Sequence, residues 1–189
     1  ILIYNLADIK KPFDSINKIR EYAKEKGIER LHISAVRRTV NAEELEQSGY
    51  SLDSLTDFPP HLIGGVGIDY DNPQRFHVKA GHIKDYRKTV NYHANMPKQM
   101  YTYFRTAILQ WDNTARRGEE AYIFEEFSFE EYKKWLYAIK RYTVRQNRPG
   151  EDLVFINAWN EWAEGTYLEP DKVNGYKALE TTKEVLEMR

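Results

Sequence analysis

The chain has 189 residues, of which 41% are hydrophobic and 30% are charged, so it holds enough apolar material for one sizeable core in a single domain. Its 28 basic and 29 acidic residues give a net charge of -1, and the basic residues are interspersed with acidic ones. This balance argues against nucleic acid as a partner. The absence of cysteine excludes disulfides and thiolate metal sites, and we expect no metal or cofactor.

The sequence leaves the cellular compartment open. No apolar run approaches the roughly 18 residues that a membrane-spanning helix needs, and the first residues have no signal-peptide layout. These features favour the cytoplasm, but a cysteine-free chain is equally compatible with the periplasm. Because the chain starts at Ile1 and its first residues already have the pattern of a strand, we expect it to be a fragment or a processed chain.

The first part of the chain alternates between apolar runs and helical patterns. Residues 1–5 predict a strand, and Pro12 opens a helical pattern that Gly27 ends. Residues 31–36 predict a second strand, and residues 41–49 predict a short helix that ends at a glycine. The order of strand and helix is therefore the same in both units.

The middle of the chain continues this order with a longer connection. Residues 52–58 predict a third strand, which is followed by Pro59, Pro60 and His61. Residues 62–74 contain several glycines and a proline and are too long for a simple connection. Long loops after strands often carry function. A helix is predicted near residues 83–92 and a fourth strand over residues 105–111.

The last third of the chain begins with a helix signal. Residues 128–131 have the spacing of a capping box, and apolar residues recur after them at helical intervals. Residues 153–159 predict a fifth strand, and residues 175–188 predict an amphipathic helix.

Five apolar strands that alternate with helices indicate an α/β fold with a parallel sheet covered by helices. Polar residues follow successive strands, at Asn5, His61, Asp112 and Asn160. In a (β/α)8 barrel of the TIM type the loops after all strands meet at one rim, whereas a doubly wound sheet uses mainly its switch point. We therefore favour the barrel over the doubly wound sheet. A complete barrel of this kind needs around 300 residues, so we expect the last five βα units of one domain, with three amino-terminal units missing.

Two glutamates three residues apart, Glu161 and Glu164, directly follow the fifth predicted strand in the segment NAWNEWAEGTYLEP. If the backbone turns into helical geometry there, their Cβ atoms lie about 5–6 Å apart, whereas in a strand they point to opposite faces. Two carboxylates at that separation suit retaining glycoside chemistry, because their repulsion lets one of them act as an acid. The alternative is that they only cap and solvate a helix start.

Aromatic and amide side chains surround the two glutamates. Trp159 and Trp162 flank them, and the flat faces of tryptophan bind the apolar faces of sugar rings. Asn157 and Asn160 could hydrogen-bond sugar hydroxyls. Tryptophans are more often buried for packing, and we expect Trp159 to belong to the core.

The segment WDNTARR, at the end of the fourth predicted strand, offers a second set of polar groups. Asp112 and Asn113 can bind hydroxyls after Trp111, and Arg116 and Arg117 can pair with an acidic sugar or a phosphate. The alternative is a turn closed by the aspartate side chain, with the arginines in solvent.

Three further positions carry weaker signals. His61 could contact a sugar or transfer a proton, but a hydrogen-bonded structural histidine is an equal alternative. Tyr4 and Asn5 follow the first strand in the same way. Residues 69–71 match the Asp-x-Asp pattern with which many glycosyltransferases hold a metal and a nucleotide diphosphate, but chance explains a three-residue pattern better.

Three segments together resemble one protein family: INAWNEWAEGTYLEPD at 156–171, WDNTARR at 111–117 and DSLTDFPPH at 53–61. From Ile1 to about Leu186, the chain resembles the glycosyltransferase WbsX family, whose barrel is similar to that of glycoside hydrolase family 99. The resemblance implies a (β/α)8 barrel that acts on glycans.

The resemblance also implies roles for the two glutamates. Glu161 and Glu164 stand at the catalytic carboxylates of the hydrolases' Glu-Trp-His-Glu motif. By this resemblance Glu161 assists the sugar's own 2-hydroxyl as internal nucleophile, and Glu164 is the general acid and base. Ala163 replaces the histidine of that motif, which puts the identity of the substrate in doubt more than the carboxylate chemistry.

The resemblance therefore implies a carbohydrate-active enzyme of bacterial polysaccharide or O-antigen metabolism, either a glycosidase or a glycosyltransferase. The expected catalytic residues are Glu161 and Glu164, and the expected substrate-binding residues are Asn5, His61, Trp111, Asp112, Asn113, Arg116, Asn160 and Trp162. One alternative is a glycan-binding domain without catalysis. Another is a structural half-barrel whose open edge strand at residues 1–5 predicts dimerisation or aggregation.

Overall fold

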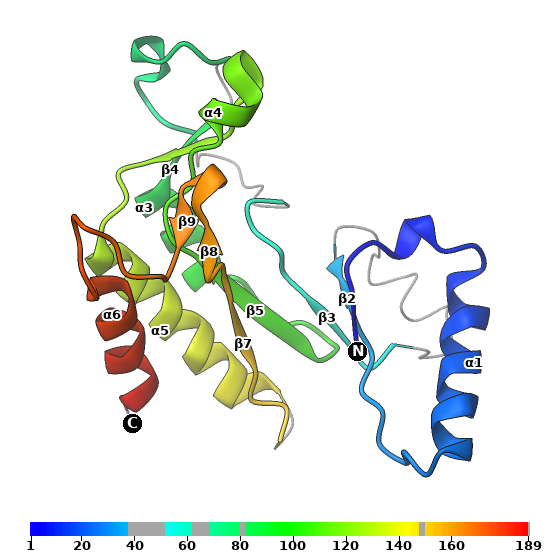
Figure 1. Cartoon of the computed structure of the whole chain (residues 1–189). Coiled ribbons are helices and arrows are strands. Elements are labelled where there is room, and N and C mark those ends of the chain that lie inside the picture. The colour runs from blue at the N-terminus through cyan, green and yellow to red at the C-terminus, as the bar shows by residue number, and fades with distance from the viewer. Residues whose placement is uncertain (38–51, 62–68, 80–81, 148–149, 189) are drawn as a thin grey trace.

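A computed structural model describes residues 1–37, 52–61, 69–79, 82–147 and 150–188. Five parallel strands form one curled sheet in the order β1-β2-β3-β5-β7, so that neighbours in the sheet follow one another along the chain (Figure 1). These strands are β1 (Leu2–Ile3), β2 (Ser34–Val36), β3 (Ser54–Thr56), β5 (Tyr103–Ile108) and β7 (Val154–Asn157). The α/β class and the parallel sheet are confirmed, and the sheet has the form of part of a barrel wall.

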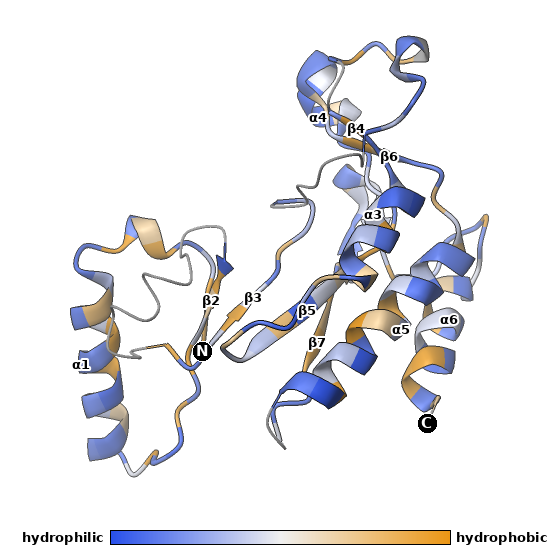
Figure 2. Cartoon of the chain, turned by 180° about the vertical axis from the view of Figure 1, so that it is seen from behind, coloured by the Kyte–Doolittle hydropathy of each residue, from blue (hydrophilic) through white to orange (hydrophobic). Residues whose placement is uncertain are grey.

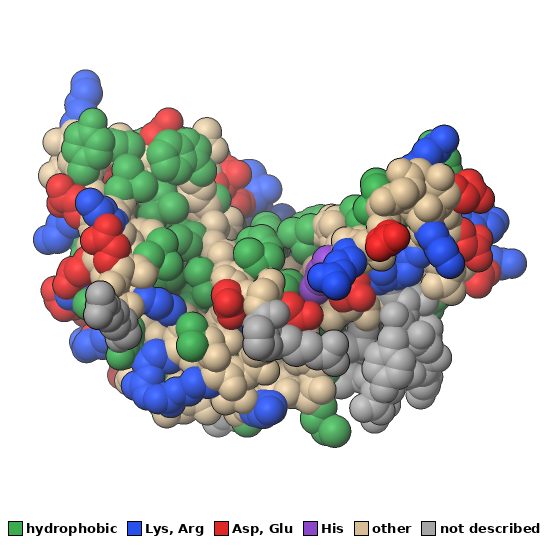
Figure 3. Space-filling model, turned by 90° about the horizontal axis from the view of Figure 1, so that it is seen from below, with side chains coloured by type: hydrophobic (Ala, Val, Ile, Leu, Met, Phe, Trp, Pro, Cys, Tyr) green, Lys and Arg blue, Asp and Glu red, His purple; other side chains and the backbone are tan. Residues whose placement is uncertain are grey.

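Four long helices in the described part of the chain accompany the sheet: α1 (Pro12–Glu25), α3 (Tyr86–Ala94), α5 (Phe129–Gln146) and α6 (Lys177–Glu187). Figure 1 shows α1 beside the first strands and α5 and α6 beside the last ones. Figure 2 shows the hydrophilic residues of α1 on its outer side, as expected for an amphipathic helix that covers a sheet. Seen from below, the surface is hollowed between two lobes (Figure 3).

Side-chain caps fix where two helices begin. Ser128 accepts a hydrogen bond from the Glu131 N–H at 3.2 Å, which confirms the predicted start of α5. The helix predicted near residues 83–92 begins later than expected, because Asp85 accepts hydrogen bonds from the N–H groups of Arg87 and Lys88. The helix predicted at residues 41–49 lies outside the described residues.

Short elements outside the main sheet were not predicted. β4 (Ile83–Asp85) pairs in parallel with β6 (Ile123–Glu125), and short helical turns include η1 (Leu6–Asp8), η3 (Pro73–Arg75), α4 (Thr114–Arg117) and η4 (Gly118–Glu120). A strand of three residues spans too little sequence to show a period of two, which is the physical reason that β4 and β6 were missed.

The core lies between the sheet and its helices. Leu55 of β3 and Tyr103 of β5 are in register and pack in one buried cluster with Ile16 of α1. Ala107 of β5 packs in a second cluster with Trp135 of α5 and other apolar residues. Odd-numbered residues of β5 therefore face the helices, because side chains alternate along a strand.

One position on this helix-facing side is an arginine. Arg105 is 1% exposed, and its Nε donates to Asp57 Oδ2 at 3.0 Å while Nη2 donates to the carbonyl oxygen of His93 at 3.0 Å. The Tyr103 hydroxyl donates to the other oxygen of Asp57. Burial lowers the pKa of His93 to about 4, so the imidazole is neutral at physiological pH. This buried polar network joins β3, β5 and α3.

None of the helices in the described part of the chain combines the length and the apolar character that crossing a bilayer requires.

Candidate functional site

The chain leaves the sheet at Asn157 and folds into a short hairpin. β8 (Asn160–Glu161) pairs antiparallel with β9 (Thr166–Tyr167), and the turn between them is the 3-10 helix η5 (Trp162–Glu164). Glu161 therefore ends a strand and Glu164 ends a helical turn. The helical geometry predicted for the segment applies to its second half, and the strand pairing of its first half was not predicted.

The hairpin is fixed against the segment that follows β5. The N–H of Asp112 donates to the carbonyl oxygen of Glu164 at 2.9 Å. Gly165 has a φ of +69°, and a Cβ there would lie 3.3 Å from the backbone nitrogen of Asp112. A glycine at this position therefore allows both the left-handed turn and the close approach of the two segments.

A second set of contacts connects the hairpin to the loop after β3. The Asn157 side-chain amide donates to the carbonyl oxygen of Pro59 at 2.6 Å, and the Thr166 hydroxyl donates to the carbonyl oxygen of Asn157 at 2.7 Å. Asn157, which the sequence offered as a ligand for sugar hydroxyls, thus holds two strand ends together. The peptide bonds Pro59-Pro60 and Asn157-Ala158 are cis.

The ends of β1 and β3 meet in an aromatic cluster. The Tyr4 ring contacts the Phe58 ring edge-on at a centroid distance of 5.0 Å, and His61 stacks on Phe58 at 6.1 Å. His61 is exposed, and Asn5 starts the short helix η1 beside Tyr4. The structure therefore brings the carboxyl ends of β1, β3 and β7 to one edge, as a barrel rim requires.

The two glutamates have different surroundings. Among the described residues, no hydrogen bond or ion pair involves the exposed side chain of Glu161. The side chain of Glu164 is 13% exposed and contacts the guanidinium of Arg116 in α4. A guanidinium beside a carboxylate stabilises its ionised form. One glutamate is thus open to solvent, and the other is paired with a cation.

The tryptophan between the glutamates is held in a fixed position. The Trp162 ring stacks on Tyr167 with a centroid distance of 3.7 Å and an interplanar angle of 15°. Its Nε1 donates to Glu169 Oε2 at 2.7 Å, yet 48% of the residue is exposed. The remaining surface of the ring is therefore available to a ligand.

The position predicted for Trp159 is wrong. The residue was expected in the core, but it is 53% exposed. The reason is that β7 ends at Asn157, so Trp159 lies two residues beyond the strand and outside the packed sheet. Beyond the strand, the Trp159 carbonyl oxygen accepts from the N–H groups of Leu168 and Glu169.

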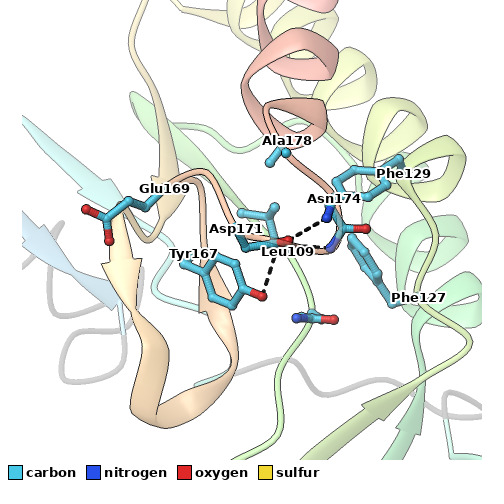
Figure 4. A pocket seen from close by; sticks show the side chains of 10 residues that line it. Leu109, Phe127, Phe129, Tyr167, Glu169, Asp171, Asn174 and Ala178 are labelled. Carbon is cyan, nitrogen blue, oxygen red and sulfur yellow. Dashed lines mark hydrogen bonds between the residues drawn. The ribbon is translucent and has the colours of Figure 1, made fainter.

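A small network of hydrogen bonds holds the hydroxyl of Tyr167 (Figure 4). Its hydroxyl donates to Asp171 Oδ2 at 3.2 Å, and the Asn174 side-chain amide donates to the same oxygen at 2.9 Å. Burial raises the pKa of Tyr167, and the neighbouring Asp171 raises it further. The cavity here has a volume of about 20 Å³, which is too small for a sugar ring. The network instead fixes the ring on which Trp162 stacks.

The segment after β5 is mostly structural. Trp111 and Asn113 are buried, at 5% and 6% exposed, and Asn113 Oδ1 accepts from the Tyr122 N–H at 2.7 Å. Asp112 Oδ1 accepts from the N–H two residues ahead at 2.8 Å, which is the aspartate-closed turn considered as the alternative. Of the residues proposed here as ligands, Arg116 is the one whose charged group reaches the hairpin.

The Asp-x-Asp pattern forms ion pairs instead of a metal cluster. Asp69 pairs with Lys84, and Asp71 pairs with Lys88 at 2.6 Å. Within the described ranges, no group of three or more histidine, aspartate or glutamate side chains is arranged to hold a metal ion.

A groove of about 810 Å³ lies between the hairpin, α4 and β6. Its aromatic lining residues are Trp111, Phe124, Phe127, Trp162 and Tyr167, its acidic ones are Asp112, Glu125 and Glu126, and the others are Gln110, Thr114, Ala115, Ile123, Ala163 and Gly165. Asn160, at the start of β8, is exposed outside this lining.

Sequence reasoning missed the residues that support Trp162. Tyr167 and Glu169 lie inside the segment that carries the glutamates, so their place in the sequence could have indicated that they belong to the site. Their contacts with Trp162, however, depend on the pairing of β8 with β9. Glu125 of the groove ends the strand β6, and Glu126 follows it; this strand was itself too short to predict.

Residues 1–182 match the model of a protein family described as Glycosyltransferase WbsX. The protein called Uncharacterized protein WxcX, from two strains of Xanthomonas campestris pv. campestris, is 27% identical over 186 residues in each case. This match covers 98% of the chain and 26% of the relative's length. The chain thus spans about a quarter of these curated relatives.

A solved structure titled Glycoside hydrolase-like protein is similar in fold. It superposes with a TM-score of 0.60 at 13% sequence identity, and the match covers 100% of this chain and 54% of that one. At this level of identity the likeness concerns the fold, and it agrees with a partial barrel.

Proposed function

The chain belongs to the glycosyltransferase WbsX family, and on this premise we propose that it is part of an enzyme that cleaves or transfers glycosyl groups on an oligosaccharide or polysaccharide. The observation that carries the proposal is the placement of Glu161 and Glu164 on one hairpin at the carboxyl end of the sheet, with the exposed Trp162 between them. In its finer form, the proposal makes the curled sheet the last five units of a (β/α)8 barrel.

The position of the hairpin supports a catalytic site. Active sites of barrel enzymes lie at the carboxyl ends of the strands, where the connecting loops meet. Here the hairpin that follows β7 is hydrogen-bonded to the segment after β5 through Asp112 and to the loop after β3 through Asn157. Both glutamates are therefore carried by a segment that is held from two sides.

We assign the chemistry to the two carboxylates. The exposed Glu161 removes the proton of the sugar's 2-hydroxyl, whose oxygen then attacks the anomeric carbon as the bond to the leaving oxygen breaks. Glu164 gives its proton to that leaving oxygen. A water molecule or the hydroxyl of another sugar next attacks the anomeric carbon, and the bond from that carbon to the 2-oxygen breaks. Glu164 takes the proton of the attacking hydroxyl, and Glu161 returns its proton to the 2-oxygen. Two inversions give net retention, and the acceptor decides between hydrolysis and transfer.

The ion pair between Arg116 and Glu164 adds a condition to this assignment. The guanidinium stabilises the ionised carboxylate, whereas a proton donor must hold a proton before the reaction. Arg116 is largely exposed and sits at the surface, so it can turn away. We therefore propose that glycan binding displaces Arg116 and allows Glu164 to protonate.

Substitution of the two glutamates tests the proposal. Glu161→Gln and Glu164→Gln in the full-length protein should each lower turnover by about 10²–10⁴-fold, the range for general acid–base groups. Glu180→Gln, at an exposed position of α6, is the matched control and should leave turnover unchanged. Neutral oligosaccharides and nucleotide sugars are assayed in parallel, and turnover of nucleotide sugars alone would reject hydrolysis. Unchanged rates in both variants would remove the glutamates from the mechanism.

A second candidate function is glycan binding without catalysis. It is favoured by the ion pair that engages Glu164 and by the exposed, fixed ring of Trp162. Sugar binding that persists in both glutamate variants, together with no turnover by the unsubstituted protein, would support this second function.

A further inference from the structure

The groove between the hairpin, α4 and β6 is called the hairpin groove below. Neither Glu161 nor Glu164 is among its lining residues. Its lining includes Trp162, Ala163 and Gly165, the chain neighbours of Glu161 and Glu164. Its volume of about 810 Å³ falls within the roughly 300–1,000 Å³ that is common for small-molecule sites. A ligand in this groove would therefore lie beside the two glutamates.

The hairpin groove has a rigid aromatic surface. One face of the Trp162 ring is covered by Tyr167, and its N–H is bound by Glu169, but 48% of the residue remains exposed. The exposed part is thus the side away from Tyr167. A ring that is already fixed loses little conformational entropy when a ligand packs on it. Such a flat apolar surface suits the C–H face of a sugar ring.

The charges of the hairpin groove restrict its ligand. Three carboxylates, Asp112, Glu125 and Glu126, are among its lining residues, and Glu126 is paired with Arg87 at 3.5 Å. The lining that the described residues form has no lysine or arginine of its own, so it is acidic. Arg116, which the sequence predicted as a partner for acidic sugars, is not among the residues that line this groove. An anionic sugar would be repelled by like charges here, whereas an uncharged sugar would not.

The hairpin groove continues along the surface. A second hollow of about 340 Å³ shares Gln110 and Phe127 with it and is lined further by Phe129, Asn174 and Lys177, among others. Two adjoining hollows offer more length than a single sugar needs. This arrangement fits a segment of a linear glycan.

We propose that the hairpin groove is a subsite that binds an uncharged segment of the glycan chain, with Trp162 as its stacking platform. The proposal deepens and rests on the proposed function, which supplies the class of ligand. It assigns a binding site to the sugar residues next to the bond that reacts. It also specifies that these sugar residues are uncharged.

The test measures binding, so that it does not depend on turnover. Full-length protein carrying Glu161→Gln is titrated calorimetrically with hexasaccharides of mannose, glucose and galactose and with hexagalacturonate as the anionic probe. We expect binding of at least one neutral hexasaccharide and binding of hexagalacturonate that is weaker by about tenfold or more.

Two variants assign the binding to the hairpin groove. Trp162→Ala removes the platform and should weaken the neutral ligand by about tenfold. Trp159→Ala is the matched control, because this residue is similarly exposed but does not line the groove, and its effect should stay within about twofold. Ala115→Trp fills the groove without removing a packed side chain, so it should weaken binding even if Trp162→Ala destabilises the hairpin.

Three results would overturn the proposal: no neutral hexasaccharide binds, hexagalacturonate binds as well as the neutral ligands, or Trp159→Ala weakens binding as much as Trp162→Ala. The failure of the proposed function is distinguishable. If Trp162→Ala and Ala115→Trp weaken binding but the unsubstituted protein turns over no substrate, the subsite stands without the enzyme. If the glutamate variants abolish turnover but neither groove variant affects binding, the enzyme stands without this subsite.

Discussion

Two regions of the molecule use polar side chains in opposite ways. On the helix-facing side of β5, a buried network joins Arg105 to two other polar residues. The Arg105 guanidinium is hydrogen-bonded to the Asp57 carboxylate and to both the ring and the carbonyl oxygen of His93. At the carboxyl end of the sheet, Glu161 and Trp162 are exposed. A buried polar group destabilises the fold unless it is hydrogen-bonded, so the polar groups of the first region serve to stabilise the folded state. In the second region, the Glu161 carboxylate and part of the Trp162 ring are exposed, so a ligand can reach them.

The largest expected effect on stability comes from breaking the buried network. Arg105→Met leaves the Asp57 carboxylate without its cationic partner, and we expect the free energy of unfolding to fall by about 3–5 kcal/mol. Urea unfolding followed by tryptophan fluorescence measures this change. The double variant Arg105→Met with Asp57→Asn should recover part of the loss, because the unpaired charge is then removed. A loss below about 1 kcal/mol would show that the network is not a stability element.

The next effect concerns pH. Burial lowers the pKa of His93 from its ordinary value of 6.5 to about 4, so between these values the unfolded chain binds more protons than the folded one. Stability should therefore rise with pH across this window, be complete above about 6.5 and be lost as pH falls to about 4, by on the order of 3 kcal/mol. Unfolding free energies of the unsubstituted protein and His93→Gln, compared from pH 7.5 down to 4, measure the difference. Equal slopes in both proteins would contradict the assignment to His93.

A smaller effect is expected at the junction of the hairpin and the segment after β5. Gly165→Ala places a Cβ at a φ of +69° and 3.3 Å from the Asp112 nitrogen. We expect a loss of about 1–2 kcal/mol from the left-handed conformation, with a fall in turnover because the hairpin carries both glutamates. Gly27→Ala, where φ is +79° but no atom lies within 4 Å of the added Cβ, is the matched control. It should lose similar stability but keep its turnover.

The smallest effect on stability is expected where the proposed effect on activity is large. Glu161→Gln should change the free energy of unfolding by less than about 0.5 kcal/mol, because the exposed carboxylate has no bonding partner among the described residues. Urea unfolding of the same preparation used for the activity assay provides the measurement. A loss well above this value would assign Glu161 a structural role and weaken the contrast between the two regions.

The sequence alone predicted much of the fold because local rules govern it. The apolar runs located all five strands of the main sheet, and the spacing at Ser128 located the start of α5. A buried strand needs a short run of apolar residues, and a helix start needs a side chain that accepts hydrogen bonds from its first N–H groups. Both requirements involve only a few neighbouring residues, so they can be recognised in a short stretch of sequence. The glutamate pair was found in the same way, as a short motif next to a strand.

The tertiary structure determined which of the candidate side chains are exposed to solvent. Asn113 and Trp111 are buried, and Trp159, expected in the core, is exposed. These outcomes depend on contacts between distant parts of the chain, such as the hydrogen bond from Asn157 to Pro59, which are 98 residues apart. A periodic pattern shows that a residue lies in a strand or a turn, but exposure is set by whatever packs on that residue from elsewhere. The pairing of Glu164 with Arg116 and the lining of the hairpin groove could therefore come only from the folded chain.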